Sequence, residues 1–144
     1  MRNLSRPASY SFIMGILLTC VLAATGAAST HPLGSSPQIP AAEGKAKIRH
    51  ASNGNTEIQL EVKHLAPPER IDPTTSVFVV WVRGLEAGAL PQNLGALRTN
   101  KNLSGKIKSV TSLREFDLFL TCEGTQTVVA PSTVELMPLH YSGK

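Results

Sequence analysis

Hydrophobic and polar residues alternate strictly over two neighbouring parts of the chain, positions 45–50 and 57–64. Apolar side chains or histidine stand at every second position, with lysine, arginine, glutamate or glutamine between them. This period of two is typical of a β-strand that buries one face and leaves the other in water. The pattern therefore predicts two half-buried strands.

The turn between these strands contains Asn53 and Gly54, a pair that favours a two-residue hairpin loop. A two-residue loop would place Ile58 opposite Arg49 and mix apolar with basic side chains on one face. A shift of one residue places Ile58 opposite Ile48 instead. We therefore predict a three-residue loop in which Gly54 adopts a left-handed conformation.

The segment 77–82 is apolar at every position and contains the only tryptophan, Trp81. Such a run is typical of a strand covered on both faces, so we predict that it lies at the centre of a sheet. No stretch of the later chain has a helical period. About seven short strands separated by turns predict an all-β fold, an immunoglobulin-like antiparallel β-sandwich. The weaker strand patterns that complete it lie at 94–98, 106–111, 116–122 and 133–136.

Alternate residues of the segment 77–82 point to opposite sides of its sheet. Phe78, Val80 and Val82 share one side, and Trp81 belongs to the other. One side forms the core, and the second must be covered by the preceding linker, by loops or by a partner. In the last case Phe78, Val80 and Val82 are the candidate contact patch, and an envelope protein is the candidate partner.

Residues 1–28 have the three-part layout of a secretory signal peptide. Arg2 and Arg6 precede an apolar run at 12–22, and small residues follow up to Ala28. Two alternatives remain open: an uncleaved membrane anchor, and a lipoprotein signal in which Cys20 carries the lipid. A cleaved signal predicts a secreted or periplasmic protein, whereas either alternative would hold it on a membrane.

Residues 29–44 are largely serine, proline, alanine and glycine. Because three of them are prolines that interrupt regular elements, the segment is predicted to be a flexible linker. The β-sandwich domain then spans residues 45–144. The whole chain has 144 residues, of which 42% are hydrophobic, and this is material for one domain.

The charge of the chain is modest. The full sequence has a net charge of +4, and removal of the signal leaves twelve basic and ten acidic side chains, a net charge of +2. Lys45, Lys47 and Arg49 form the only local basic row, which we interpret as the solvated face of a strand. With 5% aromatic residues and mixed charges throughout, we expect no nucleic-acid partner.

The sequence contains no Gly-x-Ser-x-Gly elbow, His-Glu-x-x-His, Cys-x-x-Cys or phosphate loop. We therefore expect no enzymatic activity and no cofactor. Cys122 is the only cysteine after the signal, and it alternates in phase with Phe116, Leu118 and Leu120. This phase predicts a small buried apolar residue, and a reactive thiol or an intermolecular disulfide is the alternative.

Two groups of potential metal ligands have the wrong spacing for a shared site. Cys122, Met137 and His140 lack the histidine between cysteine and methionine that a blue-copper site needs. His50 and His64 would lie roughly 25 Å apart in the predicted strand register. Neither group is expected to bind a metal.

His31 is the one candidate metal ligand that remains, and it depends on where the signal is cleaved. Cleavage after Ala28 would leave Ser29, Thr30 and His31 at the amino terminus. The free amine, two amide nitrogens and the imidazole can then surround square-planar copper(II) or nickel(II). Cleavage one residue earlier would remove this arrangement.

The second half of the chain combines strand and turn residues in a distinctive order: 77–81, Pro91, Asn93, Leu94, Gly95 and Leu97, Gly105, 116–123 and 131–136. In this order they resemble the extracytoplasmic C-terminal domain of RskA-type anti-sigma-K factors. The resemblance implies a bacterial envelope or secreted β-sandwich related to sensor domains. Gly124 stands where that family usually has proline, and its sigma-binding domain is not recognisable, so sigma binding is not expected. The connector Leu65 to Pro68 is also similar to one in small secreted bacterial proteins.

Together these patterns predict a non-catalytic secreted or periplasmic β-sandwich with a binding or structural role. An envelope sensor or regulator related to anti-sigma factors is the first alternative. Amino-terminal binding of copper or nickel through His31 is the second.

Overall fold

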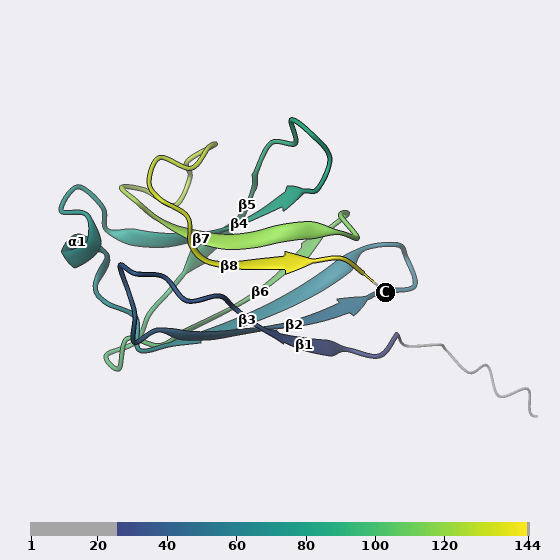
Figure 1. Cartoon of the computed structure of the whole chain (residues 1–144), viewed down its shortest axis with the longest axis horizontal. Coiled ribbons are helices and arrows are strands. Elements are labelled where there is room, and N and C mark those ends of the chain that lie inside the picture. Colours follow the sequence, from purple (N-terminus) through teal and green to yellow (C-terminus); the bar gives the residue numbers. More distant parts are fainter. Residues whose placement is uncertain (1–25, 144) are drawn as a thin grey trace, which may run out of the picture.

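The computed structural model describes residues 26–143, and almost all of its regular structure is β-strand (Figure 1). Eight strands in this range form two antiparallel four-stranded sheets that pack face to face, as the sequence predicts for a β-sandwich. The one short helix in this range, α1 (Pro68–Ile71), begins at the second of two consecutive prolines. The predicted signal peptide lies outside the described residues, apart from positions 26–28.

The lower layer in Figure 1, called sheet A here, has the strand order β1-β2-β3-β6. The upper layer, sheet B, has the order β5-β4-β7-β8. The strands of sheet A are β1 (Ser29–Pro32), β2 (Glu43–His50), β3 (Thr56–Lys63) and β6 (Gly105–Thr111). The strands of sheet B are β4 (Val77–Gly84), β5 (Gln92–Leu97), β7 (Phe116–Glu123) and β8 (Leu136–Tyr141).

The predicted hairpin register is confirmed. Ile48 of β2 pairs with Ile58 of β3, and Ala51 donates its amide hydrogen to the carbonyl of Asn55, 2.8 Å away. Three residues remain in the loop, and the last of them, Gly54, has a φ of 87°. The register keeps all inward positions of β2 and β3 apolar until the strands end at Thr56.

The core lies between the sheets and is built from the inward positions of strands on both sides. Full burial of a side chain such as valine, leucine or phenylalanine contributes about 1.5 to 3 kcal/mol each, so this layer is the main source of stability. Sheet A supplies Ala46, Ile48, Ile58, Leu60 and Val62, and sheet B supplies Phe78, Val80, Val82, Phe116, Leu118, Leu120 and Cys122.

Strand β4 is central, as predicted, because β5 and β7 flank it. On its outer face, Val79 and Trp81 form a second apolar cluster with Phe119 of β7, and Val128 of the loop that follows β7 packs against this cluster. The Trp81 indole N–H donates to the Thr121 hydroxyl, 2.8 Å away, and Thr121 in turn donates to the carboxylate of Glu123. The chain itself therefore covers both faces of β4.

Residues 29–44 are not a free linker, contrary to the sequence-based expectation. Ser29 to Pro32 pair with β2 as a strand, and the segment that follows buries Ser36 and Ile39. The Ser36 hydroxyl accepts the Met137 amide hydrogen at 2.6 Å, which joins this segment to β8. The prolines end the strand and shape the turn without freeing the chain.

The final strand also differs from its prediction at 133–136. At that place the Thr133 hydroxyl, and not a strand partner, pairs with both backbone groups of Cys122. Strand β8 begins only at Leu136 and continues through Pro138, which an edge strand tolerates because it needs no donor on its outer side. Among residues 26–143, no helix is long and apolar enough to cross a membrane.

Candidate functional site

The predicted contact patch is not on the surface. Phe78, Val80 and Val82 are at most 1% exposed and belong to the core between the sheets. The prediction fails because the inner face of β4 packs on sheet A, while the outer face receives the loop from Gly124 to Glu135. A partner has no access to these three side chains in the folded domain.

His31 lies in β1, where its ring packs edge-on against Tyr141 and its Nε2 is 2.9 Å from the Ser29 hydroxyl. Leu33 donates its amide hydrogen to Gly44, so by the alternation of an antiparallel ladder the His31 amide also faces β2. An amino-terminal copper chelate would need that amide nitrogen. Metal binding at His31 and pairing of β1 therefore exclude each other, and the metal site stays a prediction.

The other histidines do not come together. His50 ends β2 and contacts Thr56 and Tyr141, whereas His64 follows β3 at the opposite end of the strand pair. His64 has a φ of 56° and is exposed, so it leaves the strand alternation, and Leu65 is buried beside it. Among residues 26–143, no three histidine, cysteine or acidic side chains are grouped to hold a metal ion.

Cys122 is buried, as predicted from its phase in β7. Burial raises the pKa of its thiol to about 11, although a hydrogen bond with Thr75 lowers it in part. At neutral pH the side chain is a protonated thiol, which is a poor nucleophile. Met137 is buried in the core, and His140 lies 2.8 Å from the Asp117 carboxylate on the outer side of sheet B.

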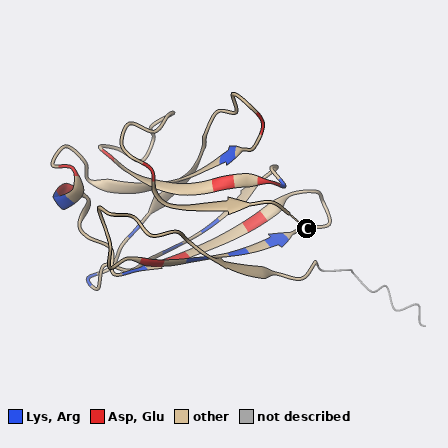
Figure 2. Cartoon of the chain, viewed as in Figure 1, with Lys and Arg blue, Asp and Glu red and all other residues tan. Residues whose placement is uncertain are grey.

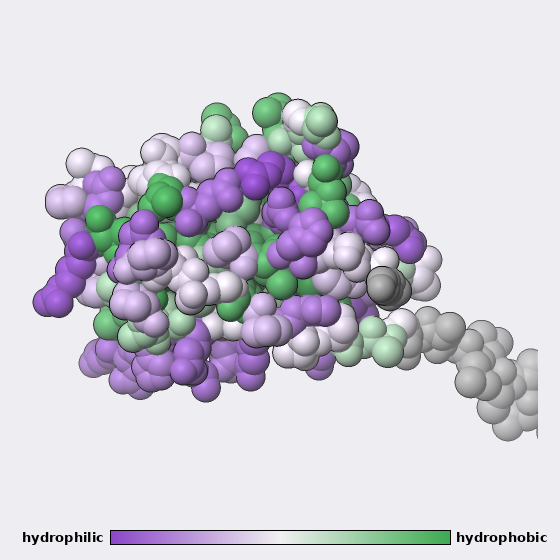
Figure 3. Space-filling model, in the orientation of Figure 1, coloured by the Kyte–Doolittle hydropathy of each residue, from purple (hydrophilic) through white to green (hydrophobic). Residues whose placement is uncertain are grey.

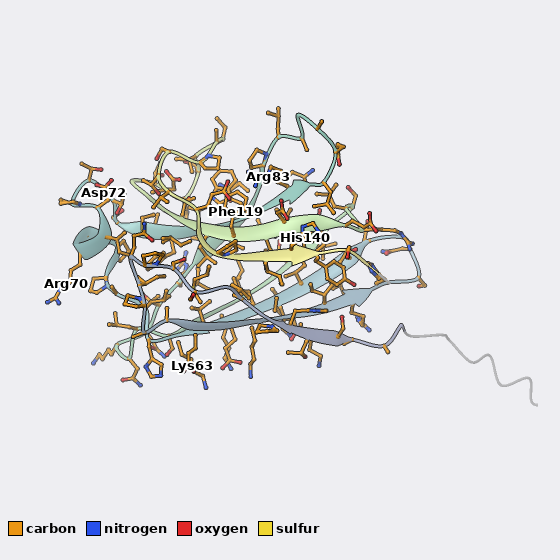
Figure 4. The ribbon with its side chains drawn as sticks, viewed as in Figure 1. Lys63, Arg70, Asp72, Arg83, Phe119 and His140 are labelled. Atoms are coloured by element: carbon orange, nitrogen blue, oxygen red, sulfur yellow. The ribbon has the colours of Figure 1, made fainter. Side chains whose placement is uncertain are left out.

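A second cluster of charges on sheet B is internally paired. Arg83 donates to Glu135 at 2.7 Å, lies 3.6 Å from Asp117 and stacks over the Phe119 ring (Figure 4). The hydrogen bond with Glu135 raises the pKa of Arg83 further above its ordinary value, against the effect of burial. Because each charge has an opposite partner, this cluster ties β4, β7 and β8 to the covering loop and offers little to a ligand.

The outer face of sheet A has a different character. Figure 2 shows several blue segments along this lower layer, and Figure 3 shows hydrophilic residues gathered at the lower left edge of the molecule. We call this surface the basic face. It consists of Thr30 from β1, Glu43, Lys45, Lys47 and Arg49 from β2, Glu57, Gln59, Glu61 and Lys63 from β3, and Lys106 and Lys108 from β6.

Part of the basic face is neutralised by its own acids. Arg49 pairs with Glu57 at 2.5 Å. Glu61 lies 3.4 Å from Lys45, 3.6 Å from Lys106 and 3.8 Å from Lys63. Burial alone would raise the pKa of Glu61, but the charges of Lys106 and Lys45 outweigh it and lower the pKa, so Glu61 stays ionised.

Between these two paired regions runs one row without acids. Thr30, Lys47, Gln59 and Lys108 lie opposite one another on four consecutive strands, and we call them the donor row. Within residues 26–143, neither lysine forms a salt bridge, and the Thr30 hydroxyl and Gln59 amide have no hydrogen-bond partner. All four line a shallow hollow of about 270 Å³, and Glu61 with its partners Lys45 and Lys106 lines the adjoining part of the same hollow.

Comparison with known proteins found no family model that matches the chain and no similar curated protein or solved structure. The resemblance to anti-sigma-factor domains therefore stays a prediction. The argument about function rests on the surface of this chain alone.

The sequence alone predicted only the part of the basic face that β2 contributes. It recognised the row of Lys45, Lys47 and Arg49 but not the contribution of Lys106 and Lys108. The available signal was the period of two in Lys-Ile-Lys, which marks a second strand with an outward basic face. Its position beside β3 depends on a pairing of strands that are distant in sequence.

Proposed function

We propose that the chain is an exported, non-catalytic β-sandwich that binds an anionic ligand through the basic face of sheet A. The observation that carries this proposal is the segregation of charge. The basic face holds six basic and three acidic side chains, a net charge of +3. The remainder of residues 29–144 carries six basic and seven acidic side chains, a net charge of −1.

This distribution would orient the molecule toward an anionic surface, since a field of one sign attracts and aligns a ligand of the opposite sign. Most lysines of the face are well exposed, with Lys106 at 76% and Lys45 at 57% side-chain exposure. Exposed ion pairs contribute at most about 1 kcal/mol each, so several contacts must act together. A ligand with many charges suits such a surface better than a small monovalent ion.

Export is the second half of the proposal, and it rests on the layout of residues 1–28. Strand β1 begins at Ser29, directly after Ala28, where the predicted signal peptide ends if cleavage follows that residue. Processing at that position would retain every strand of sheet A. The basic face would then meet the anionic polymers and lipids found outside a cell.

The test is retention of the protein on a heparin column, a sulfated polysaccharide, at an ionic strength of about 0.15 M. One variant replaces Lys45, Lys47, Lys106 and Lys108 with glutamine. The matched control replaces four exposed bases elsewhere with glutamine, so that both variants reach the same net charge; these bases are Arg70, Arg98, Lys101 and Arg114.

We expect the wild type and the control variant to be retained and the basic-face variant to elute early. Circular dichroism and thermal unfolding of all three proteins serve to establish that each is folded. Equal loss of retention in both variants would show that only net charge matters and would contradict the proposal. So would failure of the wild type to bind.

A further inference from the structure

The donor row differs from the rest of the basic face because its two lysines have no carboxylate partner. Lys45 and Lys106, which flank Glu61, already share a carboxylate. Lys47 and Lys108, which flank Gln59 in the same way, share a neutral amide instead. The positive charge of the face is therefore concentrated over Gln59.

The geometry of the sheet brings these donors within reach of one bound group. Neighbouring strands lie about 4.8 Å apart, so the backbones at Lys47 and Lys108 are separated by roughly 10 Å across Gln59. Both side chains are long and flexible enough to lean toward the centre of the row. The ammonium groups, the Gln59 amide and the Thr30 hydroxyl then all offer hydrogen-bond donors toward the same hollow.

We propose that the donor row is a binding site for a phosphate monoester group, an inference that rests on the proposed function. A phosphate monoester has a charge of about −1.5 to −2 at neutral pH and three terminal oxygens that accept hydrogen bonds. Two unpaired lysines match this charge, and the amide and hydroxyl serve the remaining acceptors. A carboxylate has one charge and two oxygens, so it leaves part of the row unsatisfied.

The neutral side chain of Gln59 is what leaves Lys47 and Lys108 free to bind an anion. Glutamate at this position would pair with Lys47 and Lys108, as Glu61 pairs with its own two neighbours, and would repel an incoming anion. The Gln59→Glu variant is expected to fold because it repeats a row already present in the same sheet. The reverse change, Glu61→Gln, would release Lys45, Lys63 and Lys106 and extend the unpaired region.

The test is a titration of the protein, as processed by its host, with inorganic phosphate at constant ionic strength, followed by NMR of the backbone amides. We expect saturable shifts centred on Lys47, Gln59 and Lys108, and acetate binding at least about five-fold more weakly. Gln59→Glu should weaken phosphate binding about ten-fold, whereas Glu61→Gln should strengthen it several-fold. The matched control is Gln126→Glu, the same substitution at an exposed position of the loop on sheet B.

Two further probes separate the sources of the phosphate group: glucose 6-phosphate as a soluble sugar phosphate, and vesicles containing phosphatidic acid as a lipid phosphate. Binding of either probe that is lost in Gln59→Glu supports the proposal and identifies the source. Equal weakening by Gln59→Glu and Gln126→Glu, or shifts outside the donor row, would overturn it. Retention on heparin that persists alongside such a result would leave the anionic-ligand function intact, so the two failures are distinguishable.

Discussion

At the scale of single residues, backbone conformation and buried hydrogen bonds decide which substitutions a position tolerates. Gly54 closes the β2–β3 hairpin with a φ of 87°, and no atom lies within 4 Å of the place a Cβ would occupy. Its role is therefore purely conformational. Glu123 shows the opposite case, because it is fully buried and its carboxylate has several specific partners.

Replacement of Gly54 tests the hairpin. We expect Gly54→Val to lower the free energy of unfolding by about 1 to 2 kcal/mol, because a side chain disfavours the left-handed region and β-branching makes it worse. Gly54→Asn should cost less, since asparagine tolerates this region. Urea titrations measure both, and a near-neutral effect of Gly54→Val would refute the turn conformation.

Glu123 holds the covering loop over Trp81. Its carboxylate accepts hydrogen bonds from the Thr121 hydroxyl at 2.6 Å, from the Ser132 amide at 2.9 Å and from the Ser132 hydroxyl. We expect Glu123→Ala to destabilise the protein by about 1 to 3 kcal/mol, because buried donors lose their acceptor. Trp81, the only tryptophan, should then show red-shifted and more easily quenched fluorescence.

Glu123→Gln separates hydrogen bonding from charge. The amide oxygen can still accept from Thr121 and from the Ser132 amide, and its nitrogen can donate to the Ser132 hydroxyl. This variant should therefore stay close to the wild type in stability and fluorescence. If glutamine were as damaging as alanine, the charge and not the hydrogen-bond pattern would be what holds the loop.

At the scale of elements, local periodicity was sufficient for some strands and insufficient for others. The alternation in β2 and β3 determined both strands and their register, because a shift by one residue would expose every apolar side chain. Strand β1 was missed because its short, proline-ended sequence is stabilised by pairing with β2 and not by a pattern of its own. The donor row was missed for a related reason, since it forms only when β1 and β6 join opposite sides of the β2–β3 hairpin.

The role of residues 29–44 as part of the domain leads to a direct prediction. Ile39 is 4% exposed and packs in the core, so Ile39→Ala should lower the free energy of unfolding by about 2 to 5 kcal/mol. Gln38→Ala, the same substitution at the exposed neighbour, should have little effect. Guanidinium titrations measure the free energy of unfolding of both variants. Equal stability of the two would show that Ile39 contributes nothing to the core and that this segment is a tether.

At the scale of the whole molecule, the outer faces of the two sheets differ in burial and in charge. Sheet B buries its outer aromatic residues under its own loop and pairs the charges of Arg83, Asp117 and Glu135. Within residues 26–143, sheet A leaves its outer face uncovered and concentrates positive charge there. A net charge of +2 after removal of residues 1–28 hides this polarity, which depends on the assembly of strands from separate parts of the chain.

Export of this polarised domain predicts the intact mass of the protein recovered from its native host. We expect a mass that corresponds to residues 29–144 in the soluble extracellular or periplasmic fraction, because cleavage after Ala28 preserves β1 and therefore Thr30 of the donor row. Copper added to this protein should bind weakly, since a chelate at His31 must break the pairing of that amide with β2. A full-length mass, or one that carries lipid on Cys20, would place the sandwich on a membrane and contradict release. Tight copper binding that leaves the β1 amides protected would contradict the conclusion that the chelate and the pairing of β1 exclude each other.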